Sequence, residues 1–524
     1  MKRGVVAAAN RLAAEAGAEA LRAGGSAVDG AIAAALTMGV VEPIDCGVAA
    51  GGFLLTWEAQ SGQASALDFM STAPQSARYE FEGAFGQFLK DFHLKVKDRA
   101  NEMGARAVAV PGALRGFEAA HRRWGRLPWS ALFARPIAVA REGFQVGRYL
   151  AARIEENQDY IAPFATTRQL LLSNGGPRRH GEPMANPALA ESLAVIAREG
   201  ADALYTGALA AALVAEMRRL DGFISAEDLA GYRVRWRTPV QGTLGGHTVY
   251  SMAPPSAGAL IVLVLHALEG RLEPEALRAQ TPAALDTVLR AMRAAALERA
   301  AHLGDPEFTA VPVDRWTDPR FAASFAEAAA PTERVAGRMP SSERETTSLS
   351  VIDREGNACS LTYSNMNFSG VTLPGTGIVL NNQMLLFHPL PGSANSLAPG
   401  CRPASSMSPT IVVRGGRPVL ALGASGGPRI PTAITWTILH HLVAGLPVAE
   451  AVGRWRSHWE NGVVDIEQSL LARAGAALAE RGWALQAMED HHRLLALCQA
   501  AAAGEDGEVS GAGDPRGDGA VETE

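Results

Sequence analysis

Cysteine is scarce in this sequence, with four residues in 524: Cys46, Cys359, Cys401 and Cys498. They lie far apart, and none forms a Cys-x-x-Cys pair or stands at a zinc-ligand spacing from a histidine. Disulfide-stapled domains and zinc sites need closer, repeated spacings. The sequence therefore predicts neither a disulfide framework nor a structural zinc site, and we expect four reduced thiols.

Long hydrophobic runs and a strong charge of either sign are also missing. No stretch of about 18 apolar residues occurs, the length that a membrane-spanning helix needs. The formal net charge is −6, and so mild an acidic balance argues against a nucleic-acid partner or an anionic membrane surface. The HExxH, Walker and Gly-x-Gly-x-x-Gly motifs are absent as well, so we expect no metal and no cofactor.

The first residues do not have the pattern of a secretion signal. The apolar run at 4–9 is short, and the polar residues Asn10, Arg11 and Glu15 come directly after it. We expect this stretch to lead into the first helix, and we expect the protein to be cytoplasmic. A periplasmic location would require a start upstream of Met1.

What the chain does have is a helix-rich first part. Ala-rich helices are predicted at 11–23 and 27–41, with Ser26 as the N-cap of the second and Asp29 in its first turn. Strands at 53–57 and 64–69 and a strand at 247–252 interrupt the helical patterns. The other predicted helices are near 113–124, 129–142, 187–198, 203–219 and 281–302, with an apolar one ending near 270.

A linker rich in Pro, Ser, Glu and Arg at 330–345 precedes a strand-rich part. Strands are predicted at 347–353, 358–364, 377–380, 410–414 and 418–423, and helices at 432–444 and 468–482. The last fifteen residues are rich in Gly and Asp, and we expect them to end loosely. This pattern fits stacked sheets flanked by helices, in which the early strands are candidates to join the late ones.

Ser425 is the first of two candidate nucleophiles. Gly-Ala-Ser-Gly-Gly at 423–427 matches the Gly-x-Ser-x-Gly elbow between a predicted strand and a predicted helix. Asp465 and His491 follow in the order of a catalytic triad. The motif is short, however, and two adjacent glycines equally suit backbone N–H groups that face a ligand.

Thr346 is the second candidate, because it directly follows the linker. A hydroxyl is a poor nucleophile until a base takes its proton, and a free α-amino group, with a pKa of about 8, can be that base. A threonine at a new N-terminus carries both groups, but only after the chain is cut between Glu345 and Thr346. The alternative is that Thr346 and Thr347 simply begin a β-strand, where threonine is favoured.

Short motifs stand in a fixed order along nearly the whole chain. They include Gly-Gly-Ser-Ala-Val-Asp at 24–29, Val-Glu-Pro at 41–43, Gly-Gly-Phe at 51–53, Val-Pro-Gly at 110–112, Asp-Leu-Ala-Gly-Tyr at 228–232, Leu-Gly-Asp-Pro at 303–306, the strand at 346–353, Leu-Asn-Asn-Gln-Met at 380–384, Arg-Pro-Ala-Ser-Ser-Met-Ser-Pro at 402–409 and the glycine pair at 426–427. In this order they resemble the γ-glutamyltransferase (γ-glutamyltranspeptidase) family of N-terminal-nucleophile hydrolases.

The resemblance implies an α+β fold, a four-layer αββα sandwich built from both parts of one precursor. It implies self-cleavage into a large chain, 1–345, and a small chain, 346–524, that stay paired in one catalytic domain. Thr346 would attack an amide carbonyl and form an acyl-enzyme, which water or an amine resolves. The N–H groups of Gly426 and Gly427 would form the oxyanion hole. Ser364 stands where the family has a threonine hydroxyl that orients the new amino group.

The residues that bind a glutamyl group in the family are only partly present. Its transpeptidases bind the α-carboxylate with an arginine in Asp-Phe-Arg-Glu, where this chain has Met70. They bind the α-amino group with an aspartate after Asn-Gln-Met and an asparagine near the nucleophile. At those places this chain has the pair Leu385 and Leu386, and Met366. Methionine cannot replace the bidentate contacts of a guanidinium.

Other family positions are retained or have neighbours that could take over. Ser405, Ser406 and Gln383 match residues that contact substrate in the family, and Asn365 and Asn367 flank Met366 as candidates to compensate for it. The segment between Gln383 and Arg402 is short, so we expect no lid loop there and a more open site.

The sequence thus predicts an autoprocessing threonine amidohydrolase. Because a zwitterionic glutamyl head would be desolvated without its partners, we expect a small-molecule amide with a less charged acyl group, cleaved mainly by hydrolysis. Two alternatives stay open. One is a true γ-glutamyl hydrolase or transpeptidase that acts on glutathione-type substrates, and the other is a non-processing relic with a binding or structural role.

Overall fold

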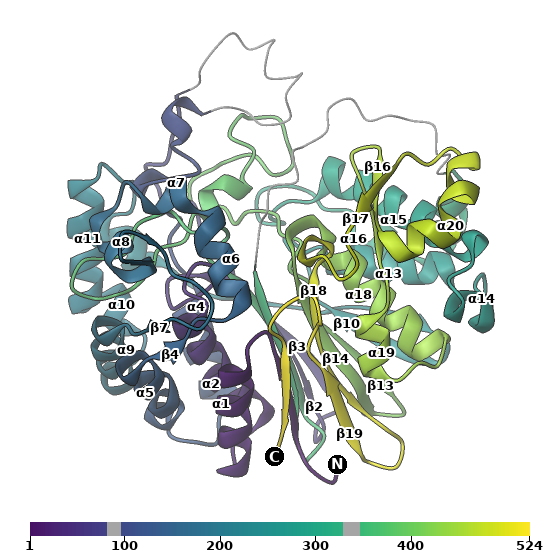
Figure 1. Cartoon of the computed structure of the whole chain (residues 1–524), viewed down its shortest axis with the longest axis horizontal. Coiled ribbons are helices and arrows are strands. Elements are labelled where there is room, and N and C mark those ends of the chain that lie inside the picture. The colour runs from purple at the N-terminus through teal and green to yellow at the C-terminus, as the bar shows by residue number, and fades with distance from the viewer. Residues whose placement is uncertain (81–95, 329–345) are drawn as a thin grey trace.

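Two stacked β-sheets form the centre of the protein (Figure 1), whose computed structural model describes residues 1–80, 96–328 and 346–524. Helices cover the outer face of each sheet, so the layers run helix, sheet, sheet, helix. Strands from both sides of the predicted linker alternate within the first sheet, and the two parts of the chain therefore make one domain. None of the helices in these ranges is long and apolar enough to cross a membrane.

The first sheet has seven antiparallel strands in the order β20-β1-β11-β12-β2-β3-β8. Their bounds are β1 Val5–Ala8, β2 Gly51–Glu58, β3 Gln63–Phe69, β8 Arg235–Arg237, β11 Thr347–Ile352, β12 Ala358–Ser364 and β20 Ala520–Thr523. The strand that begins with Thr347 is thus flanked on both sides, which fixes its position firmly in the sheet.

The second sheet has six antiparallel strands in the order β19-β18-β14-β13-β10-β9. Their bounds are β9 Val240–Leu244, β10 His247–Ser251, β13 Thr410–Arg414, β14 Arg417–Ser425, β18 Leu497–Ala503 and β19 Val509–Ala512. Smaller sheets are formed by β15 Ser457–Glu460, β16 Val463–Glu467 and β17 Leu485–Met488, and by the two-residue pairs β4 Phe144–Gln145 with β7 Pro183–Met184 and β5 Leu172–Ser173 with β6 Gly176–Pro177.

The helices on the first sheet lie on the left of Figure 1, and α1, α2 and α4 contact its strands directly. The helices of this side are α1 Arg11–Arg22, α2 Ala27–Val41, α4 Ala113–Trp124, α5 Ala134–Glu142, α6 Arg148–Glu156, α7 Gln158–Ile161, α8 Ala165–Leu171, α9 Pro187–Glu199, α10 Asp202–Tyr205, α11 Ala208–Arg219 and α12 Ala226–Gly231. The predicted cap of α2 is confirmed, because Ser26 and Asp29 form a reciprocal capping box.

The helices on the second sheet lie on the right of Figure 1, and α13, α18 and α19 contact its strands. This side contains α13 Gly258–Leu268, α14 Pro274–Arg278, α15 Pro282–His302, α16 Val313–Thr317, α17 Pro319–Ala328, α18 Ile430–Ile438, α19 Val448–Gly453 and α20 Gln468–Glu480. Every residue of α13 is buried, as expected for a helix that is apolar all round.

The two faces of the first sheet pack against different layers. Leu54 and Leu349 belong to the core under α1, α2 and α4, whereas Phe53 and Leu55 belong to the core shared with the second sheet. This alternation follows from the two-residue period of a strand. Small residues let the sheets approach closely: a Cβ at Gly423 would lie 2.8 Å from Oγ1 of Thr362.

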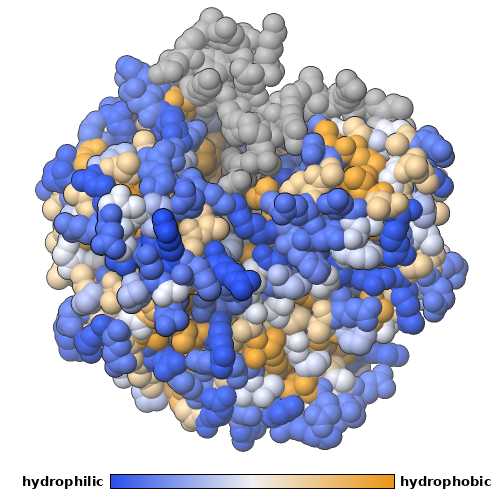
Figure 2. Space-filling view, viewed as in Figure 1, coloured by the Kyte–Doolittle hydropathy of each residue, from blue (hydrophilic) through white to orange (hydrophobic). Residues whose placement is uncertain are grey.

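On the face of the molecule seen in Figure 2 the surface is mostly hydrophilic. Hydrophobic surface gathers at the upper right of this view, where Figure 1 labels β16 and α15. All four cysteines are buried and free, which confirms the expected lack of disulfides.

Both chain ends differ from what the sequence predicts. The stretch at 4–9 does lead into α1, but it forms the strand β1, which the sequence did not predict. The last fifteen residues do not end loosely but contain β20, which pairs with β1. Burial of an apolar run beside a partner strand outweighs the local composition, and that partner is distant in sequence.

The strand expected at 377–380 is also wrong. Of these residues only Val379 makes a β-bridge, an isolated one to Thr372. The linker expected at 330–345 lies outside the described residues.

Candidate active site

Thr346 directly precedes β11, which lies between β1 and β12 in the first sheet. Its side chain is 5% exposed. The expected cleavage junction also includes Glu345, which lies outside the described residues. The candidate nucleophile is therefore held inside the protein, at the start of a strand that is paired on both sides.

The register of the β11–β12 hairpin brings Ser364 beside Thr346. Thr347 pairs with Tyr363, so the residue before Thr347 faces Ser364, the last residue of β12. Oγ1 of Thr346 donates a hydrogen bond to Oγ of Ser364 over 3.3 Å, and this oxygen also accepts the N–H of Met366 at 2.7 Å. The two residues that the sequence assigns to the reaction are thus in contact.

Gln383 is buried behind this pair and links three segments. Its Nε2 donates to the carbonyl of Ser364 at 2.7 Å and to the carbonyl of Gly51 at 3.2 Å, while its Oε1 accepts the N–H of Ser71 at 3.3 Å. Both amide protons are therefore used within the fold. In this structure Gln383 fixes the end of β12, which carries Ser364.

Asn365 and Asn367 support the turn around Met366, whose φ of 62° lies in the left-handed region. Nδ2 of Asn365 donates to the carbonyl of Pro43 at 3.1 Å, and Oδ1 of Asn367 accepts a hydrogen bond from the buried guanidinium of Arg153. Both side chains thus have partners within the protein, and they hold the backbone just beyond Ser364.

Ser405 and Ser406 lie on the segment just before β13 and are 4% and 6% exposed. The N–H of Ser405 donates to the carbonyl of Pro255 at 2.8 Å, and its Oγ accepts the N–H of Met407 at 3.2 Å. The carbonyl of Ser406 accepts a hydrogen bond from Oγ of Ser408 at 2.8 Å. The backbone of this serine pair is therefore held in one conformation.

A buried charge cluster anchors the start of that segment. The backbone N–H of Arg402 donates to Asp305 at 2.9 Å, and its Nε lies 3.3 Å from Asp68. Arg237 contacts both acids, at 3.0 Å from Asp68 and 3.6 Å from Asp305. Burial raises the pKa of Asp68, and the guanidinium groups of Arg402 and Arg237 act in the opposite direction.

We expect Asp305→Ala to lower the free energy of unfolding by about 1–3 kcal/mol, because it leaves the buried backbone N–H of Arg402 without its acceptor and removes one acid from beside Arg237. Asp305 is 1% exposed and also accepts the N–H of Glu307 at 3.1 Å. Denaturant unfolding of the purified variants would measure the change. The control is Asp314→Ala, at an exposed position of α16, for which we expect a change within about 0.5 kcal/mol. Equal effects of the two substitutions would contradict the anchoring role.

Gly426 and Gly427 follow β14 and have φ values of 123° and 57°, which L side chains rarely adopt. Where the sheets touch, β14 runs in the same direction as β12, since Oγ of Ser360 donates to the carbonyl of Leu422 and Thr362 lies beside Gly423. The continuation of β14 therefore brings the glycine pair to the end of the sheets at which β12 ends.

Ser425 does not have the surroundings of a catalytic serine. It is the last residue of β14, pairs with Leu497 and is 1% exposed. Asp465 forms an ion pair with Arg429 at 2.8 Å, and Nε2 of His491 lies 3.1 Å from the carbonyl of Gly453. Asp465 and His491 are thus engaged elsewhere, which speaks against Ser425 as the nucleophile and favours the other candidate, Thr346.

A cavity of about 410 Å³, within the range of small-molecule sites, is lined by chain neighbours of the glycine and serine pairs, whereas the two pairs themselves and Thr346 do not line it. Its walls come from α13, α15, β15 and the segment 385–389. Pro428, directly after Gly427, and Ala404, directly before Ser405, line it as well. The part of the chain that the structure describes therefore contains room for a substrate next to these two pairs.

The three apolar replacements for the family's charged residues lie in different places. Met70 is fully buried in the core, with its N–H donating to Asp68 at 3.0 Å and its carbonyl accepting from Tyr232 at 2.8 Å. Leu385 and Leu386 line the cavity. The wall that in the family would carry an aspartate is thus hydrocarbon here.

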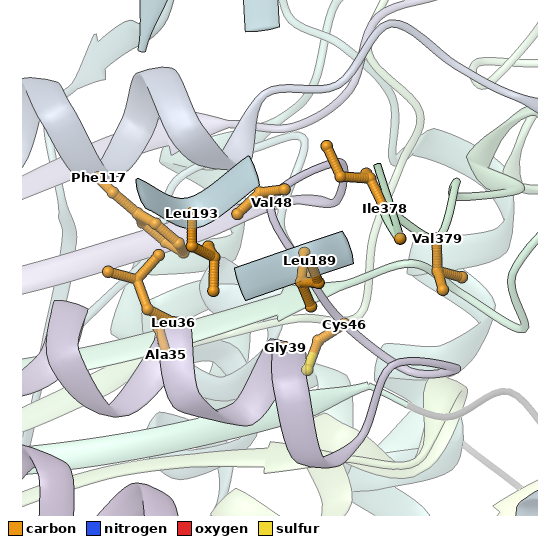
Figure 3. Close-up of a pocket in the computed structure, with 12 residues that line it drawn as sticks. Ala35, Leu36, Gly39, Cys46, Val48, Phe117, Leu189, Leu193, Ile378 and Val379 are labelled. Carbon is orange, nitrogen blue, oxygen red and sulfur yellow. The ribbon is translucent and has the colours of Figure 1, made fainter. Parts of the chain in front are cut away.

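A second cavity, of about 10 Å³, lies between α2, α4 and α9 (Figure 3). Its labelled lining is apolar except for the Cys46 thiol, and burial raises the pKa of that thiol well above its usual value. A space this small holds at most one water molecule, so it is a packing defect and not a binding site.

Sequence reasoning did not find the contribution of α15 to the large cavity. Met292, Ala295 and Leu303, in or just after this helix, line it, but they have the pattern of ordinary core positions of an amphipathic helix. No local motif distinguishes a residue that faces a cavity from one that faces a neighbouring side chain.

Comparisons with known proteins agree with this architecture. The family model described as gamma-glutamyltranspeptidase matches residues 13–523. The Glutathione hydrolase proenzyme of Escherichia coli (strain K12) is 32% identical, covering 98% of this chain and 90% of that protein. The Acylase ACY 1 proenzyme of Pseudomonas sp. (strain SE83) is 34% identical, covering 99% and 93%.

Solved structures show the same likeness. Cephalosporin acylase from Bacillus halodurans superimposes with a TM-score of 0.88 at 26% identity, covering 99% of this chain and 96% of that one. Helicobacter pylori gamma-glutamyltranspeptidase superimposes with a TM-score of 0.57 at 29% identity, covering 62% of this chain and 91% of that chain. With the layers seen here, these likenesses confirm the predicted αββα sandwich of N-terminal-nucleophile hydrolases.

Proposed function

Because the chain belongs to the gamma-glutamyltranspeptidase family, we propose that it cuts itself between Glu345 and Thr346 and then hydrolyses small amides with an apolar acyl group. Several relatives are named as proenzymes, which supports processing of one precursor into two chains that stay paired. The products would be a large chain of residues 1–345 and a small chain of residues 346–524.

In the proposed reaction Thr346 supplies both nucleophile and base. Its freed α-amino group takes the proton from Oγ1, which attacks the amide carbonyl. The N–H groups of Gly426 and Gly427 donate hydrogen bonds to the oxyanion. The amine leaves with a proton from the same amino group, and water then cleaves the ester on Thr346. Ser364, 3.3 Å from Oγ1, keeps the hydroxyl and the amino group oriented.

The observation that supports an apolar acyl group is the cavity of about 410 Å³ with Leu385 and Leu386 in its wall. A carboxylate or ammonium group placed against these two side chains would lose its hydration and gain no partner there, because the charged residues that line the same cavity lie on other segments, among them Arg299 on α15 and Glu460 on β15. Met70 offers no charge either, since its side chain lies in the core. The relatives named as acylases point the same way.

A γ-glutamyl hydrolase or transpeptidase is the second candidate. The serine pair at 405–406 favours it, because hydroxyl groups there could bind a carboxylate, and other relatives are named as glutathione hydrolases. Against it stand the missing guanidinium and the missing aspartate. The two candidates differ in the charge that they allow beside the scissile amide, which kinetics can measure.

We expect kcat/KM for a hexanoyl p-nitroanilide to exceed that for γ-glutamyl p-nitroanilide by about a hundredfold. Two hydrogen bonds to charged groups, each worth about 1.5–3 kcal/mol, are missing for the glutamyl head. Both substrates release the same chromophore, so leaving-group chemistry cancels. Saturation by the γ-glutamyl anilide at micromolar concentration, with the hexanoyl compound inert, would instead support the second candidate.

A further inference from the structure

Four charged side chains form a buried cluster that the proposed reaction does not use. Arg456, Glu467, Asp514 and Arg516 are each at most 6% exposed. Arg456 lies 2.8 Å from Asp514, and Arg516 lies 2.7 Å from Glu467 and 3.1 Å from Asp514. Burying four charges is costly even when they are paired, so their position calls for a role beyond stability.

The cluster forms hydrogen bonds to the backbone just before β18 and at its start. The guanidinium of Arg456 donates to the carbonyl of Ala496 at 2.8 Å and more weakly to that of Leu495 at 3.4 Å. Oδ2 of Asp514 accepts the N–H of Cys498 at 2.8 Å. Burial raises the pKa of Asp514, but Arg456 and Arg516 outweigh it and hold this pKa below its usual value. The carboxylate thus stays charged and bound to the arginines at neutral pH.

Ala496, whose carbonyl Arg456 binds, has a strained backbone. Ala496 adopts φ 72° and ψ 153°, a region in which almost only glycine is found. Such a conformation persists only where the surroundings impose it, and here the hydrogen bonds on both sides of Ala496 do so.

Ala496 in turn packs against the glycine turn. Because Ser425 pairs with Leu497, the preceding Ala496 lies opposite Gly426. A Cβ built on Gly426 would stand 2.7 Å from Cα of Ala496 and 2.9 Å from its Cβ. The backbone of Ala496 therefore forms the surface against which Gly426 rests.

We propose that Arg456 is a positioning residue, which with Asp514 presses Ala496 against Gly426 and so fixes the N–H groups that bind the oxyanion. This inference rests on the proposed function, because it assigns Gly426 to the oxyanion hole. A displacement of such donors by about 1 Å costs about a hundredfold in rate. Arg456 acts without touching substrate, so its loss should change kcat and leave KM alone.

The test compares Arg456→Lys, Ala496→Gly and the double variant with the parent protein, using the hexanoyl anilide at a temperature where all are folded by circular dichroism. Ala496→Gly removes the methyl group beside Gly426 and widens the range of backbone angles open to residue 496. It therefore loosens this contact without changing the charged cluster, and it keeps the test valid if Arg456→Lys does not fold. We expect kcat to fall about tenfold or more in each single variant, with KM within about twofold. The double variant should be no slower than the slower single one, because both act on the same contact.

The control is Arg178→Lys, since this arginine also binds backbone carbonyls, those of Leu170 and Pro183, but lies directly after β6, on the side of the first sheet. We expect its kcat to match that of the parent. An unchanged kcat in Ala496→Gly, or effects that multiply in the double variant, would overturn the positioning role. If the parent protein itself failed to hydrolyse the anilide, the proposed function would fail instead.

Discussion

Replacing Thr346 with alanine is expected to give a chain that neither cuts itself nor hydrolyses amides. The substitution removes the hydroxyl that attacks in both reactions, and removing the nucleophile of a covalent mechanism costs about a millionfold in kcat. The fold should survive, because within the described residues the side chain of Thr346 makes one hydrogen bond, at 3.3 Å, to Ser364. A denaturing gel after long incubation should show one band for the variant and two for the parent.

Two controls separate chemistry from packing. Thr346→Ser keeps a hydroxyl at the same place, so we expect slower but measurable cleavage and hydrolysis. Thr347→Val changes the next residue, whose Oγ1 is buried with no partner in the described part of the chain, and we expect normal processing and activity. If Thr346→Ala still cut itself and turned over substrate, another nucleophile would have to carry the reaction.

Gly426→Ala is expected to lower kcat by about a hundredfold to a thousandfold, the effect of losing one oxyanion donor. Gly426 has φ 123°, and an added Cβ would stand 2.7 Å from Cα of Ala496, which is backbone and cannot rotate away. The turn must therefore move, and its N–H groups move with it. Hydrolysis of the hexanoyl anilide under saturating conditions measures the loss.

Gly231→Ala is the matched control for that substitution. This glycine ends α12, and an added Cβ would meet no atom within 4 Å, so we expect activity equal to that of the parent. Activity in Gly426→Ala within about threefold of the parent would mean that the glycine turn does not bind the oxyanion.

Much of the fold was predictable because its signals are local. The capping box of Ser26 and Asp29 marks the start of α2, and that of Ser225 and Asp228 marks the start of α12. The hairpin of β13 and β14 follows from the glycine pair at 415–416, where both residues have positive φ. Each of these features depends on residues a few positions apart.

The elements that the sequence missed depend on partners far along the chain. β1 and β20 pair across more than five hundred residues, as Val5 opposite Thr523 shows. β18 contains Ala500–Ala503, a run that favours helix by propensity, yet β14 and β19 flank it on both sides and it becomes a strand. Tertiary pairing outweighs local preference in each case.

The candidate site divides in the same way. Thr346 and Ser364 could be paired from the sequence, because a short hairpin joins their strands. The hydrogen-bond partners of Gln383, Asn365 and Asn367 could not be predicted from the sequence, because those partners lie on distant segments. The buried cluster around Arg456 has no recognisable motif either, because its members come from three segments: Arg456 before β15, Glu467 at the end of β16, and Asp514 with Arg516 between β19 and β20.

Intact-mass spectrometry of the purified protein, before and after a brief acid-quenched reaction with the hexanoyl anilide, tests the central claim most directly. We expect two masses, for residues 1–345 and 346–524, and after reaction a hexanoyl increment on the smaller chain that maps to Thr346. A single undivided chain of 524 residues, or an increment that maps to another residue, would contradict the account.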